Sequence, residues 1–240
     1  MSYRLGVDVG GTFTDLILVD EASGKIFTAK VPSTPEDSSI GVLNGIERVC
    51  KTGDVNPNEI SQVMHGTTVA TNTILTGTGA KVGLVTTKGY KQVLQIARSY
   101  VPGGLGGWVI YNKSEPLAPL ACTIEAEERT GADGKVVRQL KKPALKTELK
   151  RLKKENIEAL TVSLVNSYAN AKHEKEVGKV AKEVLPGIPV SLSSDVVPEM
   201  QEYERTITTV ANSYVRPKVA TYVRSLQRKL TRKMKNVKLH

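Results

Sequence analysis

The sequence predicts an α/β fold in which a mixed β-sheet is flanked by helices. Three short segments near the N-terminus, about 3–9, 13–20 and 25–31, are apolar, rich in β-branched residues and joined by turn residues, as antiparallel strands are. Strand-like and helix-like segments then alternate along the chain, which is the order that gives parallel strands covered by helices. The two α/β stretches, 1–97 and 144–192, could form a single sheet into which residues 99–140 are inserted.

The later elements of the first stretch also follow from local patterns. Pro35 and the acidic residues Glu36 and Asp37 mark the start of a helix, and apolar residues recur after them at helical spacing up to about Gly53. The next expected elements are a strand at 60–64, a helix at 69–75, a strand at 81–86 and a helix at 89–97.

Residues 99–140 differ in composition from the rest. Val101–Trp108 is glycine-rich, and the pattern after it predicts a β-ribbon with strands at 123–129 and 136–140. Beyond it we expect a helix at 144–155, a strand at 159–165, a helix at 171–184, a strand at 189–192, a linker at 193–198, a long helix from 199 to about 231 and the start of a strand at 236–239. Pro217 could kink or break the long helix.

This order of elements suggests two domains. Residues 1–195 would form an N-terminal α/β domain with an insertion at 99–140. Residues 196–240 would form a linker helix and the start of a truncated second domain.

Length and composition are ordinary for a globular protein. The chain has 240 residues, 40% of them hydrophobic and 24% charged, and no run reaches the roughly 18 apolar residues of a membrane-spanning helix. The N-terminus lacks the apolar stretch of a signal peptide, so we expect a cytoplasmic protein without membrane contact. Cys50 and Cys122 lack metal-site spacing and are expected to be free thiols, and three histidines argue against a multi-histidine metal site.

The net charge of +10 comes largely from two segments. Lys141–Lys154 is predicted to be an exposed helix face, and Arg224–Lys238 contains seven basic residues and no acidic one. Such patches can bind nucleic acid, but no aromatic residues interleave with them and no nucleic-acid motif is present. A solvated face, or a face that meets an acidic partner, is therefore the preferred interpretation.

A glycine-rich turn between the first two strands has the side chains of a phosphate loop. Gly10 and Gly11 would let backbone N–H groups approach phosphate oxygens without an intervening Cβ. Thr12 and Thr14 can add hydroxyl donors. An ordinary hairpin with a Gly-Gly turn is the alternative.

Two carboxylates flank this turn. Asp8 and Asp15 could hold a phosphate-bound cation or orient water, and a plain hairpin turn requires neither. The loop is not a Walker loop, because it contains no lysine and a strand follows it, and it is not a dinucleotide fingerprint, because no helix begins at Gly11. The arrangement resembles the first phosphate loop of the actin, heat-shock chaperone and sugar-kinase superfamily.

A second polar segment, His65–Thr73, follows a strand and opens a helix. It places backbone N–H groups, hydroxyls and an amide at a helix N-terminus, which suits an anion or a carbonyl oxygen. Thr67 or Thr68 could instead be the helix cap. His65 could equally be a core histidine or make a structural hydrogen bond.

A third polar segment, Ser193–Thr206, precedes the long helix. Glu202, Glu204 and Arg205 are candidates for ion pairs between domains. The small polar residues at 206–214 could face a cleft, although a structural domain joint is the preferred interpretation.

Taken in order, five motifs resemble the hydantoinase A/5-oxoprolinase family over essentially the whole chain. They are Asp8–Asp15, His65–Asn72, Thr86–Gly89, Asn166–Asn170 and Glu202–Thr206. The resemblance implies an actin-like ATPase fold of the ribonuclease H-like type. It also implies ATP-dependent opening of a cyclic amide such as a hydantoin, 5-oxoproline or another lactam, or ATP-dependent carboxylation of a ketone, in which ATP phosphorylates a carbonyl or enolate oxygen or bicarbonate.

The resemblance also implies roles for individual residues. Asp8 and His65 would be catalytic, and Asp8 and Asp15 would bind Mg²⁺. The ATP phosphates would contact Gly10, Gly11, Thr12, Thr14 and Asp15. The substrate side of the cleft would include Thr67, Thr68, Asn72 and Arg98.

Two positions depart from the family pattern. The segment Arg98–Trp108 replaces an arginine-rich segment that usually ends in Tyr-Asp-Leu. It is nearer to the acetophenone and acetone carboxylase branch, which puts hydantoin as the substrate in doubt. Asn166 stands where a histidine is common, so acid-base chemistry is not expected of this position.

Length is a further departure, because family members are typically far longer and their second phosphate loop lies beyond residue 240. We therefore expect a fragment, or a subunit of a hetero-oligomer completed by another polypeptide, and inactivity of the isolated chain. Two alternatives stay open. One is a non-catalytic binding or assembly subunit whose basic segment 224–238 docks to an acidic partner, and the other is a small-molecule kinase of the same superfamily.

Overall fold

The structure of the chain is a computed structural model that describes residues 2–34, 36–98, 114–234 and 237–240. The chain forms two compact units. Unit 1 comprises Met1–Thr78 and Lys218–His240, and unit 2 comprises Gly79–Pro217. These limits differ from the division at residue 195 expected from the sequence.

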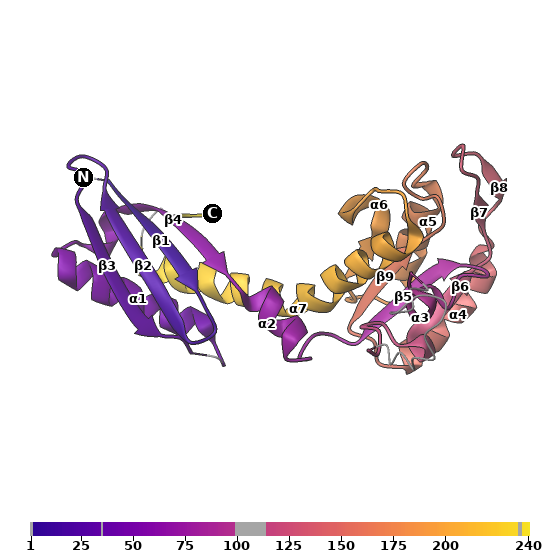
Figure 1. Cartoon of the computed structure of the whole chain (residues 1–240), viewed down its shortest axis with the longest axis horizontal. Coiled ribbons are helices and arrows are strands. Elements are labelled where there is room, and N and C mark those ends of the chain that lie inside the picture. The colour runs from indigo at the N-terminus through magenta and orange to yellow at the C-terminus, as the bar shows by residue number, and fades with distance from the viewer. Residues whose placement is uncertain (1, 35, 99–113, 235–236) are drawn as a thin grey trace, which may run out of the picture. The chain divides into compact units, whose positions relative to one another are not determined.

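Unit 1 contains a five-stranded mixed sheet in the order β11-β4-β1-β2-β3 (Figure 1). Its strands are β1 (Tyr3–Val9), β2 (Phe13–Asp20), β3 (Ile26–Pro32), β4 (Ile60–Thr67) and β11 (Lys238–Leu239). Strands β1, β2 and β3 are antiparallel, whereas β4 is parallel to β1 and β11 is parallel to β4. The predicted antiparallel beginning and the strand near residue 238 are confirmed.

One face of this sheet carries the core of unit 1. Alternate residues of β1, such as Leu5 and Val7, are buried with apolar side chains of α1 (Ser38–Gly53) and of the C-terminal part of α7 (Glu202–Lys233). Figure 1 shows α1 and the yellow end of α7 behind the sheet. The residues that alternate with them lie on the opposite face, where Asp8 is exposed, and we call this the open face.

Two short helices complete unit 1. The 3₁₀ helix η1 spans Pro57–Glu59, and α2 spans Val69–Leu75. Helix α1 begins at the N-cap residue Asp37, whose carboxylate accepts a hydrogen bond from the Ser39 backbone N–H at 3.1 Å and is paired with Lys229 of α7. Capping by a carboxylate satisfies a free N–H group of the first turn, and the ion pair ties α7 to the start of α1.

Unit 2 contains a parallel sheet in the order β10-β9-β5-β6. Its strands are β5 (Val82–Thr87), β6 (Thr123–Ala126), β9 (Ala159–Ser163) and β10 (Val190–Leu192). Both β5 and β9 are buried along their whole length, as parallel strands with both faces covered are. A two-stranded ribbon of β7 (Arg129–Thr130) and β8 (Val136–Arg138) stands apart from this sheet.

Helices cover both faces of the unit 2 sheet. On one face, α4 (Lys142–Lys154) and α5 (Lys172–Val184) pack against β5, β6 and β9 through residues such as Val85, Leu149 and Val177. On the other face, α3 (Val93–Ile96) and the N-terminal part of α7 pack through Leu94 and Val210. The remaining short elements are η3 (Leu120–Cys122) and α6 (Ser193–Val196).

The predicted α/β class is confirmed, but the expectation of a single sheet is wrong. Strand β4 pairs with β1 and β11, whereas β5 pairs with β6 and β9, so two sheets form. The expected ribbon strand at 123–129 divides into β6, which joins the parallel sheet, and β7. Helix α7 continues through Pro217, and the glycine-rich segment 101–108 lies outside the described residues.

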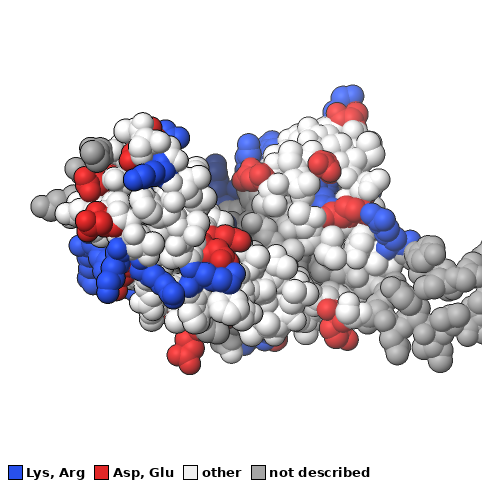
Figure 2. All heavy atoms as spheres, turned by 60° about the vertical axis from the view of Figure 1, so that its left-hand side comes forward, with Lys and Arg blue, Asp and Glu red and all other residues white. Residues whose placement is uncertain are grey.

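Many of the basic residues have acidic neighbours. In α4, Lys142 and Lys146 pair with Glu176 and Glu183 of α5, while Lys233 of α7 pairs with Glu47. Figure 2 shows unit 1 on the left, where Lys and Arg side chains gather in a band with acidic side chains beside them. Within the described residues, none of the helices is both long and apolar enough to cross a membrane.

Candidate functional site

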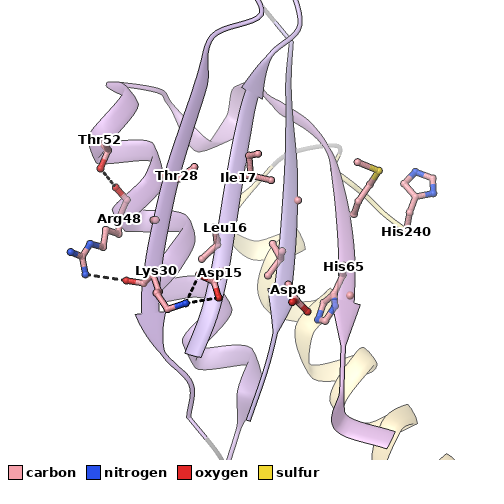
Figure 3. A pocket seen from close by; sticks show the side chains of 15 residues that line it. Asp8, Asp15, Leu16, Ile17, Thr28, Lys30, Arg48, Thr52, His65 and His240 are labelled. Atoms are coloured by element: carbon pink, nitrogen blue, oxygen red, sulfur yellow. Dashed lines mark hydrogen bonds and ion pairs between the residues drawn. The ribbon is translucent and has the colours of Figure 1, made fainter. Parts of the chain in front are cut away.

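Three charged side chains form a row on the open face of unit 1. Asp8 of β1 is the cross-strand partner of Asp15 on β2, which in turn is the partner of Lys30 on β3. Figure 3 shows the row, with Lys30 bound to Asp15 by both carboxylate oxygens at 2.9 and 3.0 Å. The row borders an open pocket of about 1020 Å³. Strand alternation places both predicted metal ligands on one face.

The two carboxylates differ in their surroundings. Asp15 is neutralised by Lys30, whereas the Asp8 carboxylate forms no hydrogen bond or ion pair within the described part of the chain. Like charges opposite one another on neighbouring strands repel, so a cation beside Asp8 would be favourable. A methyl group added at Gly66 would lie 3.5 Å from Asp8 Oδ1, so the glycine leaves space next to this carboxylate.

Hydrogen bonds on its inner side fix the turn between β1 and β2. The Gly10 N–H donates to the Phe13 carbonyl at 3.0 Å, the Ser33 hydroxyl donates to the Gly10 carbonyl at 2.8 Å, and the Ser33 N–H donates to the Thr12 carbonyl at 2.9 Å. Gly11 and Thr12 are exposed. Carbonyls are thus bonded on the inner side of the turn while its outer side faces solvent. Ser33 lies in a segment that the sequence marked only as a turn.

Thr14 lies on the buried side of this turn. Its side chain is completely buried, and its hydroxyl forms a 3.0 Å hydrogen bond with the Ser33 hydroxyl. Thr14 therefore shares with Ser33 the task of fixing the turn. The alternation that exposes Asp15 necessarily turns its neighbour Thr14 inward.

The segment 67–72 packs against the same turn. The backbone N–H and the hydroxyl of Thr68 both donate to the Val9 carbonyl, at 3.2 and 3.3 Å, and the Asn72 amide donates to the Thr68 hydroxyl at 3.3 Å. A methyl group added at Gly11 would lie 3.4 Å from Asn72 Nδ2. The Thr67 hydroxyl accepts from the Val69 N–H at 3.2 Å. The first and second polar segments thus meet at one turn.

His65 lies on the other face of the sheet. It is the partner of Val7 in the β1–β4 pairing, and its Nε2 is hydrogen-bonded to the hydroxyl of Tyr222 in α7. Burial lowers the pKa of His65 and raises the pKa of Tyr222 to about 12. Both shifts favour the neutral forms, in which the phenol donates to the imidazole. This geometry matches the structural alternative for His65.

Arg98 belongs to unit 2, where its Nε is paired with Glu204 at the start of α7. Arg205 is 1% exposed and donates to the carbonyls of Leu164 and Glu199 at 2.7 and 3.1 Å. The ion pair expected between domains is therefore formed inside one unit. Along the same helix, Thr206 and Ser213 are buried and bond to hydroxyls of β9, as expected for a structural joint.

Sequence reasoning missed a buried polar cluster in unit 2. Glu128 binds the Thr87 hydroxyl and His173 Nδ1, the latter at 2.7 Å. Glu174 accepts hydrogen bonds from the Leu164 N–H at 2.9 Å, the Ser193 hydroxyl at 2.6 Å and the Ser194 N–H at 2.8 Å. The adjacent His-Glu pair in a lysine-rich helix was the available signal.

The unit 1 site has the donor set of a magnesium–phosphate site. Mg²⁺ in nucleotide sites is held by one or two carboxylates together with phosphate oxygens and water. Asp8 and Asp15 supply two carboxylates, and the exposed outer side of the turn supplies the approach for phosphate. Within the described residues no group of three acidic, histidine or cysteine side chains could hold a metal alone. A bound cation would therefore need oxygens from its phosphate.

The fold and the glycine-rich turn define an α/β protein of the actin-like ATPase class. The model of the hydantoinase/oxoprolinase N-terminal region matches residues 4–185. The chain therefore belongs to the hydantoinase/oxoprolinase family and corresponds to its N-terminal region.

Individual relatives agree with this assignment. The chain is 33% identical to the caprolactamase subunit alpha of Pseudomonas jessenii over 92% of its length and 32% of that protein. It is 34% identical to the acetophenone carboxylase gamma subunit of Aromatoleum aromaticum over 88% of its length and 31% of that protein. These two identities do not separate the hydrolase branch from the carboxylase branch.

A solved structure supports the fold. The ATP-dependent caprolactamase of Pseudomonas jessenii matches 98% of the chain with a TM-score of 0.88 and 29% identity, and the chain covers 34% of that protein. The chain thus spans about a third of the length of these relatives.

Proposed function

We propose that the chain forms one side of the ATP phosphate site of an enzyme that opens a cyclic amide or carboxylates a ketone. The observation that carries this proposal is the row of Asp8, Asp15 and Lys30 beside an outward-facing glycine turn. The relatives add the reaction class, because one is an ATP-dependent caprolactamase and another is a subunit of acetophenone carboxylase.

In this proposal Asp8 binds Mg²⁺ and Asp15 supports it. The backbone N–H groups of Gly11 and Thr12 meet the phosphates, because these two residues are exposed and phosphate binds well to clustered N–H groups. Gly10 closes the turn instead, since its own N–H donates to the Phe13 carbonyl. Thr14 fixes the turn from inside. The cation would neutralise charge on the phosphates during transfer.

Residues 65–72 take different parts in the proposal. Thr68 and Asn72 lie beside the turn on the side where the phosphates would bind, and Thr67 orders the start of α2. His65 holds β4 to α7 through Tyr222 and acts through the position of β4, because its ring lies on the face opposite to Asp8.

We further infer that the active protein is larger than this chain. The chain covers 32% and 31% of two relatives that are themselves subunits. The second side of the ATP cleft would come from further sequence or from a partner subunit. A non-catalytic assembly role is the second candidate, supported by the basic residues of unit 1 (Figure 2).

The test is ATP turnover by the complete protein, with every segment and subunit that accompanies this chain. Asp8→Asn removes the charge that binds the cation and should lower kcat on the order of 100-fold. Asp15→Asn should have a smaller effect, because Asp15 is already paired with Lys30.

The matched control is Asp54→Asn. Asp54 ends α1 in the left-handed conformation with φ 52°, which asparagine also adopts readily, so turnover should be unchanged. Unaltered turnover in Asp8→Asn would contradict the phosphate-site assignment. Absence of turnover and of ATP binding in the complete wild-type protein would favour the assembly role.

A further inference from the structure

Unit 2 has a pocket of its own, separate from the row of charges in unit 1. Its volume is about 700 Å³, and its lining comes from the segment 89–98, from Glu125 in β6 and from residues 201–204 at the start of α7. It lies at the carboxyl ends of β5 and β6. This is the edge of a parallel sheet at which α/β proteins bind ligands, and the volume suits a small molecule.

The backbone that lines this pocket contains two unusual conformations. Ala97 has φ 53° with ψ −140°, and Gln201 has φ 81°. Positive φ is unfavourable for side chains other than Gly, Asn and Asp. Such residues persist where the surroundings enforce them, and they gather at ligand sites. Two of them at one pocket indicate a shaped site.

The charges of the described residues that line the pocket nearly cancel but leave a negative excess. Lys91 and Arg98 oppose Glu125, Glu202 and Glu204. The guanidinium of Arg98 is already held by Glu204. A ligand that carries a carboxylate would meet three carboxylates against Lys91 and an arginine that Glu204 already holds, which leaves a net repulsion at short range.

The charged groups of the pocket can serve both halves of an uncharged amide. The Glu125 carboxylate is aimed by hydrogen bonds from the Gly89 and Lys91 N–H groups at 2.8 and 3.3 Å, and its acceptor capacity exceeds these two bonds. It can accept an N–H, while the cations can donate to a carbonyl oxygen. Val93, Ile96 and the ring of Tyr203 supply apolar surface. A ketone would use only the donor half.

We propose that this pocket binds an uncharged cyclic amide and discriminates against the same ring bearing a carboxylate. The ligand class rests on the proposed function, but the pocket and its charge selectivity belong to unit 2 alone. Discrimination of this kind comes from repulsion as much as from attraction.

Three ring compounds of similar size test the proposal by calorimetric titration of the complete protein without nucleotide. 2-Pyrrolidinone should bind. 5-Oxoproline, which adds a carboxylate to that ring, and cyclopentanone, which lacks the N–H, should each bind at least about tenfold more weakly.

Glu204→Gln gives a gain of binding that misfolding cannot imitate. The substitution removes one carboxylate and releases Arg98, so 5-oxoproline should bind about tenfold more tightly. The control Glu183→Gln makes the same change at an α5 residue whose side chain is 62% exposed and paired with Lys146, and it should leave all three affinities unchanged.

Three outcomes would overturn this inference and leave the proposed function standing. They are binding of 5-oxoproline as tight as that of 2-pyrrolidinone, binding of cyclopentanone as tight as that of 2-pyrrolidinone, and no binding of any of the three rings by protein that turns over ATP. Selective binding of 2-pyrrolidinone by protein that does not bind ATP would instead support this inference and contradict the proposed ATP phosphate site.

Discussion

At the scale of single residues, neighbouring side chains in a strand have opposite surroundings. Asp15 is exposed on the open face and Thr14 is fully buried, although both belong to the motif that resembles a phosphate loop. His65 is separated from Asp8 in the same way, because its cross-strand partner is Val7. A motif therefore names residues that lie close together without saying which of them face the ligand.

The pH dependence of unit 1 tests the structural role of His65. Burial lowers the pKa of His65 in the folded state below its ordinary value, so this histidine binds a proton more readily in the unfolded chain. The contribution of neutral His65 to the free energy of unfolding is thus fully present above about pH 6.5 and is lost as the pH falls below this value. Urea unfolding followed by NMR signals of unit 1, at about pH 8 and about pH 5.5, should show this loss.

His65→Gln should reduce that loss, since the titrating group is gone. His240→Gln is the matched control, because His240 is exposed in the same unit, and it should retain the wild-type dependence. An unchanged pH dependence in His65→Gln would rule out the buried imidazole as its source.

At the scale of elements, α1 lies directly against β2. A methyl group on Gly45 would come within 2.1 Å of Leu16 Cδ1, whereas one on Gly41 would lie 3.4 Å from its nearest neighbours. Leu16 is 3% exposed and packed in the core. Glycine at position 45 thus allows the close approach of helix and strand.

Alanine substitutions at these two glycines should have opposite effects. Gly45→Ala forces Leu16 aside at a cost of about 1–3 kcal/mol, which exceeds the gain of up to about 1 kcal/mol in helix propensity. Gly41→Ala should keep most of that gain. Native-state hydrogen exchange of amides in α1 and β2 measures both changes in the free energy of opening, and equal protection in the two variants would show that helix and strand can separate freely.

At the scale of the whole molecule, the charge of +10 is distributed over internal ion pairs as well as surface. Lysines of α4 meet glutamates of α5, and lysines of α7 meet acidic residues of unit 1. Paired lysines contribute less to the release of counterions from a nucleic acid. The number of basic residues alone therefore overstates the affinity for nucleic acid.

Random-sequence duplex DNA should accordingly bind no more tightly than about 10⁻⁶ M at about 0.15 M salt. Fluorescence anisotropy of a labelled duplex over a range of salt concentrations measures this. The double variant Lys142→Gln, Lys146→Gln should change the result little. Nanomolar binding with a steep salt dependence would instead restore a role in nucleic-acid binding.

Local patterns in the sequence are sufficient to predict the class, the family and most of the elements. These follow from local patterns: strand alternation puts Asp8 and Asp15 on one face, helical spacing defines α1, α4 and α5, and ordered motifs identify the family. Each depends on residues close together in the chain, so it can be read without knowledge of distant partners.

The pairing of distant segments, in contrast, is visible in the three-dimensional structure and not in any local pattern. Four features depend on residues far apart in the chain. They are the division into two sheets, the β1–β4 register that turns His65 toward Tyr222, the hydrogen bonds of Ser33 behind the glycine turn and the Arg98–Glu204 pair. Such contacts depend on which surfaces bury one another best. A local pattern leaves that choice open, because the same strand or helix can pack in more than one register.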